Sequence, residues 1–261
     1  YGDKCSEQYH IAYLSQDGIT TEIKEVDYEP KCLINTSDSC LVFYGNTVNP
    51  TYNKDSVEVV KTTETGKVLW RYGASYGVCN NTPTDIKQTT DGGFIITGIY
   101  NYASCSFPAC NSFIIKLDKN GRFEWDKHYS TAPYLCEFQA VVEIPKKGYM
   151  FFGWAGSGFG KTWGYQVKTD LQGEKIWSKF HELKDGSFYA STMVSQNCEE
   201  YIIGGAFTGE EQKAGFIVIK TNSKGDTILS NLFMDYGFGG RNEYLIDDKN
   251  DGYVYVIHGE I

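Results

Sequence analysis

The sequence predicts an all-β protein, a single five-bladed β-propeller with four strands in each blade. Three observations support this prediction: a repeat of about 52 residues, an abundance of glycine and aromatic residues, and an incomplete repeat at each end of the chain. The 261 residues include 28 glycines, 20 tyrosines and 15 phenylalanines but 6 prolines, which is typical of short strands joined by tight turns. A hydrophobic content of 41% is enough to form a core in a chain of this length.

Each repeat begins with a short apolar run that ends at a glycine. The clearest example is Asp91-Gly-Gly-Phe-Ile-Ile-Thr-Gly98, and its relatives are residues 41–45, 149–153, 201–205 and 255–259. The closing glycines lie 52 to 55 residues apart. A short apolar run that follows turn residues predicts a buried strand.

A β-hairpin follows in each repeat. In the second repeat its residues are Lys116, the turn glycine Gly121 and then Trp125. The same spacing of lysine, glycine and a large apolar residue recurs in four repeats, and the glycine suits a turn that needs a positive φ. Trp70 and Trp177 occupy the same position as Trp125, so we expect all three tryptophans in the core.

Two hairpins give four strands, which make one propeller blade. Complete blades are expected over residues 29–75, 76–131, 132–182 and 183–235. Residues 1–28 hold only a second hairpin and residues 236–261 only a first hairpin, and each half-blade alone leaves an unpaired strand edge. We therefore expect one domain over residues 1–261, with a closing blade shared between the two ends.

The best-matching repeat resembles those of a known family. Thr90-Asp-Gly-Gly-Phe94, Lys116-Leu-Asp118, Gly121 and Trp125 are similar to the propeller repeats of secreted and cell-surface proteins, common in bacterial surface and secretion-system cargo. The similarity covers nearly the whole chain, although the first repeat lacks the Asp-Gly-Gly turn. It implies a secreted propeller and fixes no activity, because function depends on sites built onto a fold.

Cysteines and sequons also favour an extracellular location. Eight cysteines, an even number, predict disulfide bonds. Cys32 with Cys40 and Cys105 with Cys110 are the predicted close pairs, and three pairings stay open for Cys5, Cys79, Cys136 and Cys198. A bond between Cys79 and Cys136 would link successive blades. The sequons at Asn35 and Asn80 would be glycosylated in a eukaryotic secretory route.

Charge and hydropathy exclude several partners. The formal net charge is −9, from 33 acidic and 24 basic residues, which argues against nucleic acid and against a polybasic membrane anchor. No apolar run approaches the roughly 20 residues that span a bilayer. We therefore expect neither a nucleic-acid partner nor insertion into a membrane.

The candidate binding residues lie in long loops that differ between blades, whereas the turns at the opposite face are short. Residues 46–55, 101–111, 154–163 and 208–214 form these loops, and variable loops on a rigid scaffold often carry binding. Six aromatic residues are the candidate ligand or interface residues: Trp154, Phe159, Trp163, Tyr100, Tyr102 and Phe107. A bond between Cys105 and Cys110 would stiffen the second of these loops. Packing between neighbouring loops is the alternative role.

Other motifs predict no cofactor and no metal. Residues 155–162 nearly form a phosphate-binding loop, but Ala155 replaces its first glycine and a strand follows where a helix is needed. Residues 247–252 suggest a calcium loop, but Lys249 stands where an oxygen ligand belongs. The four histidines, His10, His128, His181 and His258, are scattered singly.

Some five-bladed propellers are glycosidases, which need two carboxyl groups facing each other. Alignment of the repeats puts Cys32, Asp85, Ala140, Thr192 and roughly Ile246 at one level of the innermost strands, with Glu143 and Asp248 deeper. This arrangement indicates no opposed pair.

The sequence therefore predicts a non-catalytic, secreted structural or interaction protein. Its expected partners are other copies of itself, in a filament or surface assembly, or other extracellular proteins. The alternative function is a carbohydrate-binding, lectin-like propeller, and a five-bladed glycosidase ranks below both.

Overall fold

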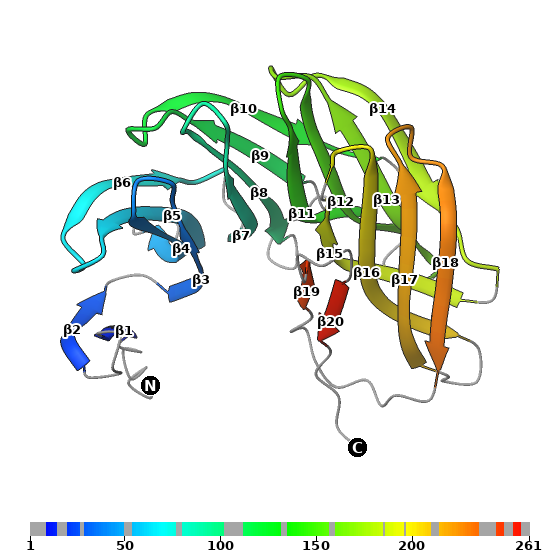
Figure 1. Cartoon of the computed structure of the whole chain (residues 1–261), viewed down its shortest axis with the longest axis horizontal. Coiled ribbons are helices and arrows are strands. Elements are labelled where there is room, and N and C mark those ends of the chain that lie inside the picture. Colours follow the sequence, from blue (N-terminus) through cyan, green and yellow to red (C-terminus); the bar gives the residue numbers. More distant parts are fainter. Residues whose placement is uncertain are drawn as a thin grey trace.

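A computed structural model describes residues 9–14, 20–26, 29–49, 54–76, 80–101, 112–131, 135–156, 160–184, 186–195, 197–209, 214–234, 244–247 and 253–256. Every regular element in these ranges is a β-strand (Figure 1). The described part therefore holds no helix long and apolar enough to cross a membrane.

Sixteen strands form four antiparallel sheets, each with its strands in chain order. The first sheet comprises β3 (Glu29–Asn35), β4 (Cys40–Asn49), β5 (Lys54–Thr63) and β6 (Val68–Ala74). The second comprises β7 (Asn80–Gln88), β8 (Phe94–Asn101), β9 (Ser112–Leu117) and β10 (Phe123–Tyr129). The third comprises β11 (Leu135–Ile144), β12 (Gly148–Gly156), β13 (Thr162–Thr169) and β14 (Lys175–His181). The fourth comprises β15 (Gly186–Val194), β16 (Glu200–Gly209), β17 (Ala214–Asn222) and β18 (Thr227–Met234). These sheets are blades 1 to 4, and they confirm the predicted all-β fold with four strands per blade.

The blades are arranged around a common axis. Their first strands β7, β11 and β15 lie toward the middle of the molecule, and outer strands such as β10, β14 and β18 lie on the rim (Figure 1). The tight turns between first and second strands, and between third and fourth strands, share one face, called here the short-turn face. The opposite ends of the strands form the long-loop face.

Two hairpins remain at the chain ends, β1 (Tyr9–Leu14) with β2 (Thr20–Val26) and β19 (Tyr244–Asp247) with β20 (Tyr253–Val256). Lys24 of β2 donates to the Gly66 carbonyl of blade 1 at 2.7 Å. The Tyr129 hydroxyl of blade 2 donates to the corresponding Gly173 carbonyl of blade 3. The N-terminal hairpin thus lies against blade 1 as an outer half-blade, while β19 contacts the inner strand β15. Each hairpin holds its expected side of the closing blade, but the two are separate two-stranded sheets.

Each junction between complete blades has its own hydrophobic core. Val42, Val57, Ile86 and Phe94 pack between blades 1 and 2, and similar clusters fill the next two junctions. The blades are therefore held by apolar side chains from both facing sheets, the largest stabilising contribution that the fold offers.

The repeated tryptophans are half-buried and pack against the turn glycine of the next blade. Trp70 contacts Gly121, Trp125 contacts Gly173 and Trp177 contacts Gly225, and a Cβ at these glycines would lie 2.4 to 2.7 Å from the indole. The three glycines also have φ of 75° to 77°. The spacing in the sequence therefore reflects two needs, a left-handed turn and a close approach by the indole.

The repeated lysine fastens the third strand to an acidic residue near the first turn. Lys61 pairs with Asp38 at 2.7 Å and Lys116 with Asp91 at 2.9 Å. The aliphatic stems of both lysines are buried, while the carboxylates are more than half exposed. The ammonium groups are buried with the rest of each lysine side chain, and their pairing with the carboxylates offsets part of the desolvation cost.

The predicted bond between Cys32 and Cys40 is wrong, and both thiols are free. Cys32 lies opposite Tyr44, whereas Cys40 closes the turn opposite Thr36. Measured along the strand direction, the two cysteines lie four residues apart, which is about 13 Å at the usual rise per residue. A disulfide needs Cα atoms about 5.5 Å apart.

Of the cysteines in the other predicted disulfides, Cys136 and Cys198 lie within the described residues. Cys136 is a buried thiol that donates to the Tyr129 carbonyl at 3.5 Å. Cys198 donates to the Glu143 carbonyl at 3.6 Å, at the opposite end of β11. Cys5, Cys79, Cys105 and Cys110 lie outside the described residues.

Candidate functional site

The two candidate tryptophans lie in strands rather than in a loop, Trp154 in β12 and Trp163 in β13. Trp154 is paired with Gly164, and Trp163 with Ala155. Because alternate residues of neighbouring strands point to opposite faces of a sheet, the two indoles lie on opposite faces of blade 3. The structure therefore separates the pair that the sequence placed together.

The other aromatic candidates contribute nothing to a described site. Tyr100 lies near the end of β8, but its side chain is outside the described part. Phe159, Tyr102 and Phe107 are likewise outside the described residues. Their roles stay predictions.

Trp154 is part of a mixed aromatic and polar group between blades 3 and 4, close to the axis and at the long-loop face. Its ring lies 5.6 Å from that of Tyr189 on the inner strand β15, edge to face. Glu137 on the inner strand β11 is the cross-strand neighbour of Trp154. Gln139 donates to the Glu137 carboxylate at 3.3 Å. These four residues, all partly exposed, are named the Trp154 cluster.

A β-bulge explains how the inner strand presents Gln139. The ladders between the first two strands slip by one residue at Lys31, Thr84, Gln139 and Ser191. A bulge bends the strand and changes the direction of a side chain, and bulges are common beside functional sites. The next residues, Cys32, Asp85, Ala140 and Thr192, lie at one level of the four blades, as the repeat alignment predicted.

Asp85 and Glu143, the acids weighed for a glycosidase, both bind backbone groups. Asp85 accepts from the backbone N–H of Ile86 at 2.9 Å and of Val141 at 3.0 Å. Glu143 accepts from the N–H and the hydroxyl of Thr90, at 2.7 and 2.9 Å. Both carboxylates therefore tie blade 2 to blade 3. Asp248 lies outside the described residues.

His181 is the buried histidine of blade 3. Its Nε2 lies 3.0 Å from Gln166 Oε1, and its Nδ1 lies 3.2 Å from Thr227 Oγ1. Burial, with a smaller effect from Lys179, lowers the pKa of His181 to about 4. The ring is therefore neutral near pH 7 and joins blades 3 and 4. Within the described residues no three metal-binding side chains gather.

Of the sequon residues, Asn35 is exposed at the end of β3. Asn80 is half-buried, and its side-chain oxygen accepts from the Asp55 N–H at 3.1 Å. Asn35 thus offers the more accessible amide, and glycosylation stays a prediction for both positions.

Sequence reasoning missed three members of the Trp154 cluster, Glu137, Gln139 and Tyr189. The contact between Trp154 and Tyr189 joins residues of two blades, and spacing within one repeat cannot reveal it. The available signal was weaker: Glu137 and Gln139 break the apolar pattern of an inner strand that otherwise buries Cys136, Phe138 and Ala140.

No protein-family model and no curated protein matches the chain. Several solved structures are similar to the chain. An endo-arabinase from Bacteroides thetaiotaomicron VPI-5482 is similar with a TM-score of 0.55 and 9% identity, over 87% of both chains. A GH43 β-1,3-galactosidase is similar with a TM-score of 0.52 and 11% identity, over 95% of this chain and 56% of that one.

The chain has the fold of these five-bladed propellers. It spans little more than half the length of the galactosidase. Identities this low show the fold alone, so the activity of this propeller has to be argued from its own residues.

Proposed function

We propose that this propeller binds carbohydrate at the Trp154 cluster without hydrolysing it. The observation that carries the proposal is the edge-to-face pair of Trp154 and Tyr189 beside the carboxylate of Glu137 and the amide of Gln139. Aromatic rings offer apolar faces to the C–H groups of a sugar. A carboxylate accepts hydrogen bonds from hydroxyl groups, and an amide both donates and accepts them.

Two further observations support this proposal. The similar structures are named as an arabinase and a galactosidase, so the fold accommodates carbohydrate chemistry elsewhere. The backbone bonds of Asp85 and Glu143 argue against hydrolysis by these two acids, because cleavage needs one carboxyl group as acid and another as base or nucleophile.

The test is a glycan array followed by titration of the best ligand with two matched variants. Trp154→Ala should weaken binding by about tenfold or more, because the stacking surface is lost. Trp163→Ala removes an indole from the opposite face of the same blade and should bind as the wild type does. Equal loss in both variants, or no glycan bound, would refute the proposed site.

The non-hydrolytic part needs its own readout. The bound glycan should be recovered intact after prolonged incubation with the protein. Release of reducing ends that stops in Glu137→Gln would show that the cluster is catalytic, and this part of the proposal would then be wrong.

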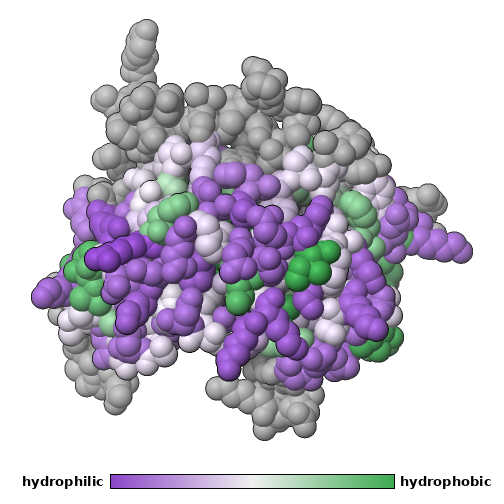
Figure 2. Space-filling model, turned by 90° about the horizontal axis from the view of Figure 1, so that it is seen from above, coloured by the Kyte–Doolittle hydropathy of each residue, from purple (hydrophilic) through white to green (hydrophobic). Residues whose placement is uncertain are grey.

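Self-association into an extracellular assembly is the second candidate function. The observation that favours it is the separation of the hairpins β1–β2 and β19–β20 into two sheets, because an unpaired strand edge can accept a strand from another copy. The rim seen in Figure 2 argues against assembly through that face, since its apolar groups are separated within a mainly hydrophilic surface.

A further inference from the structure

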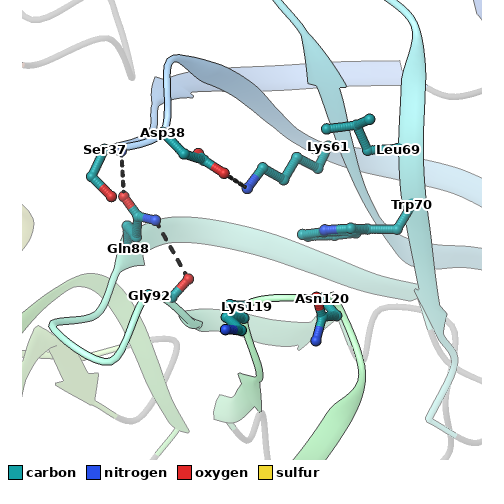
Figure 3. A pocket seen from close by; sticks show the side chains of 9 residues that line it. All are labelled: Ser37, Asp38, Lys61, Leu69, Trp70, Gln88, Gly92, Lys119 and Asn120. Atoms are coloured by element: carbon teal, nitrogen blue, oxygen red, sulfur yellow. Dashed lines mark hydrogen bonds and ion pairs between the residues drawn. The ribbon is translucent and has the colours of Figure 1, made fainter.

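A pocket of about 530 Å³ lies between blades 1 and 2 at the short-turn face (Figure 3). The Trp154 cluster lies elsewhere, between blades 3 and 4. Its walls come from the turn after β3, from β5 and β6, from the end of β7 and from the turn after β9. The volume falls within the range usual for small-molecule sites.

An indole forms one wall of this pocket. Trp70 projects between the Asp38–Lys61 pair and the turn that carries Lys119 and Asn120 (Figure 3). The backbone of Gly121 covers one side of the ring, which fixes its orientation. The indole N–H is buried and has no acceptor within the described residues.

The polar lining carries a net positive charge. Lys61 is neutralised by Asp38 at 2.7 Å. Lys119 is exposed and has no ion-pair partner in the part of the chain that the structure describes. Gln88 uses its carbonyl to accept from the Ser37 N–H at 2.8 Å. The pocket thus combines an aromatic wall with one uncompensated ammonium group.

The junction between blades 2 and 3 provides an internal comparison. It keeps the aromatic wall and the ion pair, as Trp125 and as Lys116 with Asp91. The packing and the ion pair therefore belong to the fold and do not set the charge of the pocket.

The remaining positions differ in charge between the two junctions. Glu124 replaces Leu69 and binds Lys116 at 3.2 Å. Glu143 replaces Gln88 and accepts from the turn of the preceding blade in the same way, at 2.7 Å. Leu171 replaces Lys119 at the position two residues before the turn glycine. Lys147 replaces Gly92 and adds one positive charge. The lining positions of the second junction therefore carry a net charge of −1, against +1 for the first.

We propose that the pocket at Trp70 binds an acidic sugar, with the ring against the indole and the carboxylate on Lys119. Neutral residues at positions 69 and 88 remove the repulsion that Glu124 and Glu143 would exert on an anion. The indole and the exposed Leu69 supply the apolar contact for a sugar ring. The inference does not depend on the Trp154 cluster, which lies at the other face.

The experiment is calorimetric titration of the whole protein with galacturonate, using galactose as the neutral control with the same ring. Galacturonate should bind at least about tenfold more tightly than galactose, and added salt should weaken it, because the ammonium contact is exposed. Equal binding of the two sugars, or no binding of galacturonate and its short oligomers, would overturn the proposal.

Two variants copy the acidic junction and so should fold. Leu69→Glu gives Lys61 a second carboxylate, as Glu124 does for Lys116, and Lys119→Leu copies Leu171. Each should reduce galacturonate affinity by about tenfold. The matched control Lys224→Leu changes an exposed lysine in the corresponding turn of blade 4 and should leave affinity unchanged. Unchanged binding in both pocket variants would refute the site.

Two further arms identify the ligand and separate this site from the proposed function. Tighter binding of the oligomer than of the monomer would indicate a polysaccharide source, and equal binding a free sugar acid. Acetate should not compete, and competition at equal concentration would show a simple anion site and refute the role of the sugar ring. Trp154→Ala should bind galacturonate normally, and a loss in that variant would overturn the assignment to this pocket.

Discussion

At the scale of single residues, His181 shows how a polar group is accommodated between two blades. A neutral imidazole with its proton on Nε2 donates to Gln166 and accepts from the Thr227 hydroxyl at Nδ1. Gln166 in turn donates to Thr221 at 3.3 Å. Each buried partner thus has a complementary group, and protonation of the ring would disturb this arrangement in a poorly solvated place.

The lowered pKa of His181 gives a stability prediction with a definite sign. The unfolded chain binds a proton near pH 6.5 and the folded chain near pH 4, so the stabilising contribution is complete above pH 6.5 and declines as pH falls toward 4. Between pH 7.5 and pH 5 the free energy of unfolding should fall by about 2 kcal/mol from this group.

Urea unfolding at both pH values measures this fall in the wild type and in two variants. His181→Gln cannot titrate and should lose most of the pH dependence. His128→Gln should keep it, because the His128 side chain is 44% exposed. An equal fall in the wild type and in His181→Gln would show that other groups carry the effect.

The position of a residue in the fold could be predicted from the sequence where the pattern of a single repeat determines it. The spacing of Lys116, Gly121 and Trp125 follows from one hairpin, and the structure gives each a role at that position. Trp70 also fits this pattern, but the pocket beside it depends on Leu69 and Lys119 differing from the next junction. This difference in charge between the two junctions can be interpreted only when the structure shows which residues of neighbouring blades lie side by side.

At the scale of elements, the turn after each third strand is both a reversal and a docking surface. Gly121 has φ of 75° and lies against the Trp70 indole. Gly92, in the first turn of the same blade, has φ of 82°, but a Cβ there would meet its nearest neighbour at 3.6 Å. The two glycines share the backbone requirement and differ in their packing.

This difference predicts unequal costs of alanine. Gly92→Ala should lose about 1 kcal/mol for the left-handed backbone. Gly121→Ala should lose a further 1–3 kcal/mol, roughly, because its Cβ would lie 2.4 Å from the indole. Chemical denaturation of both variants measures the costs. In a Trp70→Leu background the extra cost should shrink, and equal costs in the wild-type background would contradict the docking role.

Elements were predictable because turn glycines and apolar runs are local signals. The loop expected over residues 154–163 was too long, since β12 continues to Gly156 and β13 begins at Thr162. Cross-strand pairing extended these strands beyond their apolar runs. The bulges at Thr84 and Gln139 depend on curvature of the whole blade and have no comparable local signal.

At the scale of the whole molecule, the two end hairpins are complementary in position. The hairpin β1–β2 lies against blade 1 through Lys24 and through apolar contacts of Ile11 and Val26 with Phe43 and Val60. β19 lies beside β15. The outer half of a closing blade is thus docked at one end of the row of blades, and the inner half at the other end.

The relation between these halves decides between a closed ring and an assembly of copies. Two ends of one chain face each other at an effective concentration in the millimolar range, roughly, whereas copies in solution are micromolar. We therefore expect closure within one chain, and mass photometry from nanomolar to micromolar concentration should give particles near 29.4 kDa throughout. Regular oligomers or filaments that grow with concentration would show strand exchange between copies and favour the structural role. In that case Lys24→Glu, which removes the bond to Gly66, should weaken the assembly and leave single subunits folded, because the hydrophobic cores between the complete blades are built from other residues.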